Sequence, residues 1–405
     1  MGVYLYDVII IGAGPGGNIA AIRLASMGHK VVLLDWRKIV GDKLCTGIVG
    51  KECVEKFPPN ETHIHQEARC ATVVSPAGKR YQVAKEQTQA YIIDRVAYVD
   101  SFAKRAIGAG ATYHLGYKVT NIDVSTSGVI VTASSASKNY FYKAKMVIIA
   151  SGFASPLLKM VGLHKGLNQE YLLGEQAEVS VNGLENTEVY LGNKISPGSF
   201  GWLVPISDSK ALVGLISRHK LNGHIKRFLD ELRLERKVDE VIKPPKRWGI
   251  PLTPLSKTYG NRVIAIGDSA GLAKPTTGGG IYYALRTGEM AAEVIGQALE
   301  LDNFTETQLK IYQSKWKQVF GRELLIGYSG RVMYETLKDS EIEKILNVIS
   351  SSGLQQELMD SPDFSFDWHA KIILKALRHR YLGSYIKSFS PILARMIGRI
   401  VKSKL

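Results

Sequence analysis

The chain has 405 residues, of which 45% are hydrophobic and 22% charged, and its formal net charge is +15. Its length fits two or three domains, or one large fold with an inserted layer, and its composition excludes disordered and collagen-like proteins. Three cysteines, Cys45, Cys53 and Cys70, are too few, and odd in number, for a secreted disulfide scaffold.

No run of about 18 apolar residues is present, so no membrane-spanning helix is predicted. The apolar run at residues 8–11 is only of strand length and leads directly into glycines, so no secretory signal is predicted. We therefore expect a cytoplasmic protein, soluble or peripheral at a membrane surface.

The first part of the chain alternates strands and helices. A buried strand, a glycine-rich turn, a helix and a second buried strand are predicted over residues 7–11, 12–17, 18–27 and 30–35. A hairpin, a helix and a set of alternating strands are predicted over residues 70–84, 94–109 and 118–150.

The middle of the chain is β-rich and the end is helical. Strands are predicted over residues 172–179, 188–192, 201–205 and 211–217, with a helix over 223–235. A buried strand over 262–266 and a long helix over 281–299 follow, and the remainder reads as mostly helical.

This order predicts an α/β fold. A Rossmann-type nucleotide-binding domain is built from the discontinuous segments 1–68, 85–168 and 251–300. An inserted antiparallel β-sheet domain for the substrate uses 69–84 and 169–250, and a helical C-terminal domain with a basic tail covers 301–405.

The glycines at residues 12–17 point to a dinucleotide site. Gly12 permits a tight turn, Gly14 lets a pyrophosphate approach the backbone, and Gly17 permits close packing of helix on strand. Asp35 ends the second strand, where an acid accepts hydrogen bonds from ribose hydroxyls. Strand, turn, helix and acid in this order predict a Rossmann-type site.

A second signal favours FAD over NAD. Asp268 follows a buried strand and the glycine at 267, and its carboxylate can accept a hydrogen bond from a ribityl chain, which NAD lacks. The glycines at 278–280 precede the helix over 281–299 and can set its positive N-terminus against the flavin ring. No metal site is predicted.

These motifs together resemble the geranylgeranyl reductase family, within the FAD enzymes that share the p-hydroxybenzoate hydroxylase fold. The resemblance covers roughly residues 5–300 and is carried by the stretches 12–17, 43–53, 94–95, 103–106, 199–205, 267–271 and 277–281. It implies that FAD is bound by Gly12, Gly14, Gly16, Gly17, Asp35, Cys45, Thr46, Gly47, Arg95, Val119, Asp268, Gly280 and Ile281.

The resemblance also implies a role for each of these residues. Gly16 and Asp35 would hold the adenosine end, and Val119 would pack at the adenine. The segment 45–47 would run past the flavin, and Arg95 would reach the cofactor phosphates or the ribityl chain.

At the other end of the cofactor, Asp268, Gly280 and Ile281 would bind the ribityl chain and the ring. Substrate would lie against Phe200, Trp202, Val204 and Pro205.

Two departures from the family pattern stand out. The pattern Tyr-x-Trp-x-Phe-Pro becomes Phe200-x-Trp202-x-Val204-Pro205, so its last aromatic residue is replaced. Related hydroxylases carry Asp-Gly where this chain has serine and glycine at 151–152, which weakens the case for hydroxylase-type handling of NADPH.

The resemblance implies an enzyme that reduces C=C bonds of geranylgeranyl chains on a lipid or a diphosphate. Aromatic walls suit a long branched hydrocarbon, which binds mainly by burial of apolar surface. An isolated C=C needs a hydride from reduced flavin and a proton on the other carbon, and Cys45 is the candidate proton donor.

Other interpretations remain open. Cys45 can instead be a packed thiol or half of a redox-sensitive bridge, and Phe-x-Trp-x-Val-Pro is also close to the signature of flavin halogenases. A flavin monooxygenase or halogenase is therefore the alternative enzyme, and a flavin sensor the non-enzymatic one. The electron donor would be NADPH or a small iron–sulfur protein.

The C-terminal tail is strongly basic. Nine basic and no acidic residues follow Asp367, and residues 391–403 have an apolar stripe at helical spacing. Such a helix suits an anionic membrane surface or packing on the protein itself. No basic groove motif is present in the body of the chain, so nucleic acid is not an expected partner.

Overall fold

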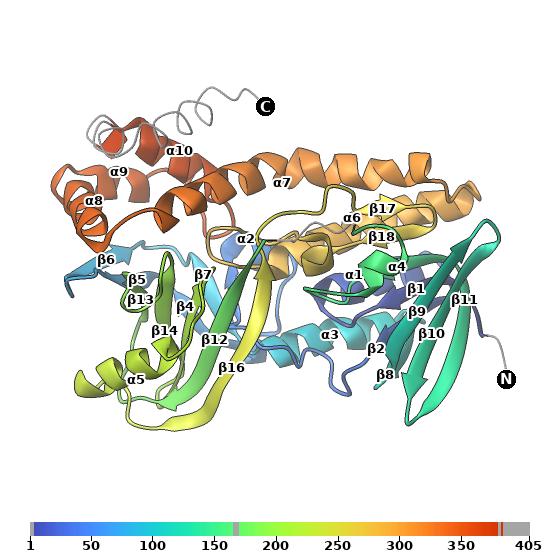
Figure 1. Cartoon of the computed structure of the whole chain (residues 1–405), viewed down its shortest axis with the longest axis horizontal. Helices are drawn as coiled ribbons and strands as arrows, with labels where there is room; N and C mark the ends of the chain where they lie inside the picture. Colours follow the sequence, from blue (N-terminus) through green and yellow to red (C-terminus); the bar gives the residue numbers. More distant parts are fainter. Residues whose placement is uncertain (1–3, 165–169, 380–381, 384–405) are drawn as a thin grey trace.

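The computed structural model describes residues 4–164, 170–379 and 382–383. Among these residues the strands form sheets of eight, seven and three strands. Figure 1 shows the two large sheets on opposite sides of the molecule, with helix α7 (Glu306–Glu335) running past both.

The eight-stranded sheet has parallel strands at its centre. Strand β1 (Tyr4–Ile11) lies between β11 (Lys138–Ile149) and β2 (Val31–Asp35) and is parallel to both. The predicted apolar runs are buried in this sheet, as expected for strands covered on both faces. Its other strands are β8 (Thr112–Leu115), β9 (Lys118–Ser125), β10 (Gly128–Ser135), β17 (Tyr259–Gly260) and β18 (Val263–Ala265).

Helix α1 (Pro15–Ser26) follows β1 and packs against α6 (Ile281–Glu300) and α3 (Arg95–Gly108). The strand, turn, helix and strand expected at the start of the chain are confirmed. Helix α6 comes from a segment more than 250 residues further along, so segments far apart in the sequence pack together here. Short helices α2 (Lys51–Lys56), η1 (Glu61–His63), α4 (Leu157–Met160) and η2 (Gly267–Ala270) lie in its connections.

The seven-stranded sheet has the order β16-β12-β15-β14-β13-β5-β6. It is antiparallel apart from the parallel pair β13–β5, through which the predicted hairpin at 70–84 joins the sheet. Its strands are β5 (Cys70–Val74), β6 (Arg80–Ala84), β12 (Tyr171–Ser180), β13 (Thr187–Leu191), β14 (Phe200–Ser207), β15 (Lys210–Ser217) and β16 (Val241–Pro251).

The two faces of this sheet have different neighbours. One face packs on helix α5 (His224–Leu234), with Leu203 and Phe228 in the shared core. The other face carries Trp202 and Ile250 and packs with Ile48 and Ala273 from the nucleotide-binding side. This second face is therefore turned toward the expected cofactor.

Strand β16 was not predicted from the sequence. Pro244 and Pro245 lack backbone N–H groups, and together with neighbouring lysines they indicate a loop. In the structure β16 is an edge strand paired with β12, and the pairing register shifts at these prolines. An edge position tolerates them because only one side of the strand needs hydrogen bonds.

The remaining elements are a small sheet and the C-terminal helices. The small sheet has the order β3 (Ile48–Gly50), β7 (Ala90–Ile93), β4 (Ile64–Ala68). After α7 come α8 (Asp339–Ser351), α9 (Leu354–Met359) and α10 (Ala370–Arg378). The amphipathic helix predicted at 391–403 lies outside the described residues.

In the part of the chain that the structure describes, no helix has the length and apolar character needed to cross a membrane. The structure assigns each strand to a sheet, and the domain limits stay a prediction.

Candidate active site

The glycine turn between β1 and α1 is shaped by backbone contacts. Gly12 has a φ of +114°, and a Cβ on it would lie 2.3 Å from the Ala150 carbonyl oxygen. A Cβ on Gly17 would lie 2.0 Å from the Gly12 carbonyl oxygen. A side chain at either position would therefore deform the turn.

Gly14 is different, because a Cβ there would meet no atom within 4 Å. Gly14 is also the N-cap of α1, and no side chain caps this helix end. The amide N–H groups of the first turn are thus open to an anion on the side that Gly14 leaves clear. This cradle fits a pyrophosphate.

Gly16 packs against another helix. A Cβ on Gly16 would lie 2.8 Å from the Ala284 carbonyl oxygen, and one on Gly288 would lie 2.4 Å from the Gly16 carbonyl oxygen. Helices α1 and α6 therefore touch through their backbones at this point. The observed contacts of Gly16 are with this helix, and its predicted role toward the adenosine stays a prediction.

Asp35 is 7% exposed and lies at the end of β2. Its carboxylate accepts N–H bonds from Ala13 at 2.7 Å and Arg37 at 2.8 Å. An ionised carboxylate has about four acceptor positions, so it can still accept from a ribose hydroxyl. The Tyr117 N–H bonds the Asp35 backbone oxygen at 2.9 Å, which places Val119 two residues further along the same segment.

The segment that follows β2 is tied to Asp268. Lys43 Nζ lies 2.5 Å from Asp268 Oδ2, and a Cβ on Gly280 would lie 2.7 Å from Asp268 Oδ1. Ile281 is the first residue of α6, whose N-terminus has no side-chain cap. The structure thus brings Asp268, Gly280 and Ile281 together, and adds Lys43, the first residue of the stretch 43–53, to which the sequence analysis gave no role.

Arg95 hydrogen-bonds the backbone of this segment. Its guanidinium Nη1 donates to the carbonyl oxygens of Gly41 and Lys43, the latter at 3.1 Å, and the side chain is buried. These hydrogen bonds fix the backbone that carries Lys43. The predicted contact of Arg95 with the cofactor phosphates or the ribityl chain stays a prediction.

Cys45, Thr46 and Gly47 form the next part of the segment. The Gly47 N–H lies 3.5 Å from Cys45 Sγ, and Gly47 has a φ of +76°. Cys45 is partly exposed, and like Cys53 and Cys70 it is a free thiol. The Thr46 hydroxyl donates to Gln176 Oε1 on β12 at 2.9 Å.

The predicted substrate residues lie on β14. Alternation along the strand puts Phe200, Trp202 and Val204 on the face turned toward the cofactor domain. Leu203 belongs to the core on the α5 side, and Pro205 shares its parity. Three of the four predicted residues therefore share one face, and Pro205 is on the other by alternation.

A buried polar cluster supports the glycine-rich segment at 274–280. Lys274 donates to the Phe366 carbonyl oxygen at 2.7 Å, and its side chain packs where a Cβ on Gly279 would be. The Asp367 carboxylate lies 4.0 Å from Lys274 Nζ and accepts the Cys53 N–H. These contacts join residues more than 90 positions apart, so no local pattern indicated them.

His369 belongs to the same cluster and gives a testable pH dependence. Its Nε2–H donates to the Phe366 carbonyl oxygen, so Nδ1 accepts from the Thr276 hydroxyl at 2.6 Å. Burial lowers the pKa of His369 to about 3. The unfolded chain, with a histidine pKa of about 6.5, binds more protons between these values, so stability falls as pH falls through this window.

Wild-type protein is therefore expected to lose stability on acidification more steeply than His369→Gln, by up to about 1.4 kcal/mol per pH unit. Urea unfolding of both proteins across this pH range measures the difference. Burial raises the pKa values of Asp367 and Glu323, which act in the opposite sense in both proteins and cancel in the comparison. Equal slopes would contradict the assignment of a neutral His369.

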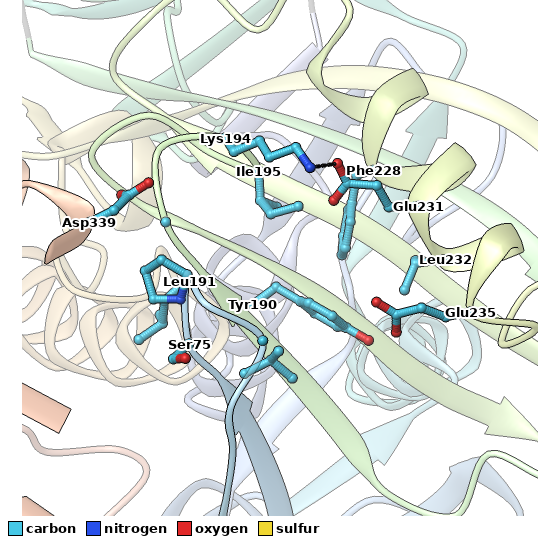
Figure 2. Close-up of a pocket in the computed structure, with 14 residues that line it drawn as sticks. Ser75, Tyr190, Leu191, Lys194, Ile195, Phe228, Glu231, Leu232, Glu235 and Asp339 are labelled. Atoms are coloured by element: carbon cyan, nitrogen blue, oxygen red, sulfur yellow. Dashed lines mark ion pairs between the residues drawn. The ribbon is translucent and has the colours of Figure 1, made fainter. Parts of the chain in front are cut away.

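A small pocket lies away from the predicted site residues. It lies on the α5 side of the seven-stranded sheet, between the β5–β6 turn and α5, and Figure 2 shows Tyr190 and Phe228 among its lining residues. Among its charged groups, Lys194 and Glu231 form an ion pair at 2.6 Å. The predicted site residues do not line it.

Comparison with known proteins agrees with this geometry. Residues 6–189 match the pyridine nucleotide-disulphide oxidoreductase family model. A digeranylgeranylglycerophospholipid reductase of Methanocaldococcus jannaschii is 30% identical over 369 residues, which is 86% of this chain and 91% of that protein. A protein of the same name from Methanococcus aeolicus is 28% identical over 96% of this chain and 98% of its own.

The chain belongs to the geranylgeranyl reductase family. A geranylgeranyl bacteriochlorophyll reductase-like protein of Thermoplasma acidophilum shares its fold, with a TM-score of 0.86, 24% identity and coverage of 98% of this chain and 100% of that one. A flavin-dependent brominase is a more distant structural relative, with a TM-score of 0.68 and 15% identity over 96% of this chain and 100% of its own.

This member of the geranylgeranyl reductase family is thus an FAD-dependent oxidoreductase. Its residues fit the cofactor. The open cradle at Gly14 suits the pyrophosphate, Asp35 offers acceptor positions at the ribose end, and Lys43 with Asp268 lies beside the N-terminus of α6.

Asp268→Ala is expected to weaken FAD binding by an amount on the order of 1–3 kcal/mol, because it removes a half-buried carboxylate predicted to accept from a ribityl hydroxyl. Flavin retained after dilution, followed by fluorescence, measures the loss. Lys43→Met is the matched control, since it removes the partner of Asp268 and leaves the acceptor. Full flavin occupancy in Asp268→Ala would show that Asp268 does not bind the cofactor.

Proposed function

We propose that this enzyme reduces C=C bonds of geranylgeranyl chains carried on a lipid or a diphosphate. One observation carries the proposal. Gln176 accepts hydrogen bonds both from Trp202 on the aromatic face of β14 and from Thr46 in the Cys45–Gly47 segment, so the two lie side by side. The named relatives, which are reductases of digeranylgeranyl phospholipids, support the same substrate class.

The chemistry divides between cofactor and protein. When bound and reduced, FAD supplies a hydride. An isolated C=C has no polar group that the protein could hydrogen-bond. Apolar contact with Phe200, Trp202 and Trp248 therefore has to orient the prenyl chain. We propose Cys45 Sγ–H as the proton donor, since it lies in the segment bonded to this face.

Anaerobic turnover tests the proposal. Protein reduced with dithionite is mixed with a geranylgeranyl phospholipid or geranylgeranyl diphosphate, and return of the oxidised flavin absorbance is followed without oxygen. We expect oxidation of the flavin that depends on the prenyl substrate. No oxidation under nitrogen, with fast oxidation in air coupled to hydroxylation or halogenation of a substrate, would support the flavin monooxygenase or halogenase alternative instead.

The electron donor is proposed to be NADPH or a small iron–sulfur protein. Reduction of the bound flavin by each donor in turn, in the absence of oxygen, distinguishes the two. The donor that reduces the flavin within the turnover time is the one that the enzyme uses.

We also propose that the basic tail docks the enzyme on acidic membranes, where the prenyl lipid resides. Removal of residues 386–405 is then expected to abolish salt-sensitive binding to vesicles that contain an acidic lipid, without loss of FAD. Co-sedimentation of full-length and truncated protein measures this. Unchanged vesicle binding, or unfolding of the truncated protein, would favour packing of the tail on its own protein.

A further inference from the structure

Gln176 connects the aromatic face of the seven-stranded sheet with the segment beside the expected flavin. It lies in the middle of β12 and is only 4% exposed. Its Oε1 accepts from the Thr46 hydroxyl at 2.9 Å and from Trp202 Nε1 at 3.3 Å. An indole N–H is a donor only, so the amide must present its oxygen to Trp202.

The sheet fixes the indole of Trp202 relative to Gln176. Trp202 pairs with Gly214 across β14 and β15, and Gly214 pairs with Gln176 across β15 and β12, so the three residues form one row. A Cβ on Gly214 would lie 2.3 Å from Trp202 Cζ2. The indole therefore lies flat over Gly214, with its N–H reaching Gln176.

A second tryptophan repeats this arrangement in the next row. A Cβ on Gly174 would lie 2.6 Å from the ring of Trp248, and the rings of Trp202 and Trp248 meet edge to face with centroids 6.3 Å apart. Phe200 lies 6.1 Å from Trp202 on the same face. These contacts hold the aromatic rings in place. Among the residues named for this face, Gln176 is the one with a polar amide side chain.

On its other side, Gln176 meets a segment that is itself anchored. The Gly47 carbonyl oxygen accepts a hydrogen bond from the Ile93 N–H at 2.9 Å, and a Cβ on Gly47 would lie 2.6 Å from the Ile93 carbonyl oxygen. Two residues before Cys45, Lys43 is paired with Asp268. A substitution of Gln176 would thus change the position of Thr46 relative to Trp202, between the expected cofactor and the aromatic face.

We propose that Gln176 is a positioning residue, which fixes Thr46 relative to Trp202 and so determines which C=C of a bound prenyl chain comes into the reacting position. This inference rests on the proposed function and deepens it. A prenyl chain has repeated, chemically similar double bonds, so selection among them depends on the placement of the chain.

The test compares variants that remove one partner at a time. Gln176→Leu deletes both hydrogen bonds, Thr46→Val deletes the first alone, and Trp202→Phe deletes the second alone. Gln176→Glu keeps an acceptor. Glu178→Gln is the matched control, because Glu178 lies on the same strand but pairs with the exposed Lys243. Two properties are measured: the mass distribution of partly reduced chains, and the visible circular dichroism of bound FAD.

We expect Gln176→Leu and Thr46→Val to change the ratio of partly to fully reduced chains several-fold and to shift the dichroism in the same way. The double variant should behave as Gln176→Leu alone, since Gln176→Leu already removes the hydrogen bond that Thr46→Val removes. Gln176→Glu should restore the dichroism in part, and Glu178→Gln should resemble wild type.

Product ratios and dichroism that stay as in wild type in Gln176→Leu, or effects of the two single variants that simply add, would overturn the inference. If Gln176→Leu does not fold, Thr46→Val and Trp202→Phe provide the same comparison. Failure of wild-type protein to reduce any prenyl chain would refute the proposed function separately, while the dichroism still reports whether Thr46 and Gln176 are coupled.

Discussion

Gly14→Ala is expected to weaken the binding of FAD while leaving the unliganded fold as stable as wild type. The added methyl group meets no protein atom within 4 Å, so it costs the fold nothing by contact. It does occupy the side from which a pyrophosphate approaches the N-terminus of α1. FAD affinity, measured by fluorescence titration of the apoprotein, should fall at least about tenfold, or 1.4 kcal/mol.

Gly17→Ala is the matched control, and its expected effect has a different cause. A Cβ at this position would lie 2.0 Å from the Gly12 carbonyl oxygen, so the turn itself must deform. Forcing extra atoms into a packed position costs typically about 1–3 kcal/mol, and the apoprotein should lose thermal stability accordingly. Unchanged FAD affinity in Gly14→Ala, or equal apoprotein stabilities of the two variants, would contradict the assignment of the cradle.

Trp202→Ala is expected to abolish turnover on geranylgeranyl substrates while the protein keeps its flavin. The indole is 7% exposed and belongs to the seven-stranded sheet, so its removal leaves the glycine turn and the Lys43–Asp268 pair intact. Truncation of a buried tryptophan also costs stability, typically about 3–5 kcal/mol. Turnover and flavin content of the soluble protein are the two measurements.

Trp202→Phe keeps most of the apolar surface and is the companion variant. It should retain turnover, with an altered product ratio because the hydrogen bond to Gln176 is lost. An insoluble Trp202→Ala together with a fully normal Trp202→Phe would mean that this tryptophan is only part of the core of the sheet.

Local patterns were sufficient for the first half of the site. Gly12, Gly17 and Asp35 are close in sequence and belong to one strand–turn–helix–strand unit, whose spacing alone defines their geometry. Asp268 and the N-terminus of α6 were found in the same way, because a buried strand and a glycine-rich loop precede them.

The residues that the sequence did not reveal act across long separations. Gln176 is 130 residues from Thr46, and Lys43 is 225 residues from Asp268. Gln176 lies in none of the motif stretches, and Lys43 begins the stretch 43–53 but has no spacing that indicates its partner. Only the pairing of β12 with β15, and the return of the chain to the nucleotide-binding sheet, bring them into place.

Two further differences have local causes. Strand β16 was not predicted because Pro244 and Pro245 argue against a strand, and they are compatible with one only at the edge of a sheet. Pro205 was grouped with the aromatic residues of its motif, but strand alternation turns it toward the opposite face.

Mass spectrometry of lipids tests the central claim most directly. The protein is produced in a host that also makes a geranylgeranyl lipid precursor, and the masses of the prenyl lipids are compared with those from a host that carries Gly14→Ala. Reduction of C=C bonds predicts mass gains in steps of two hydrogens that depend on the wild-type protein. Unchanged lipid masses, or gains that correspond to oxygen or halogen, would contradict the account.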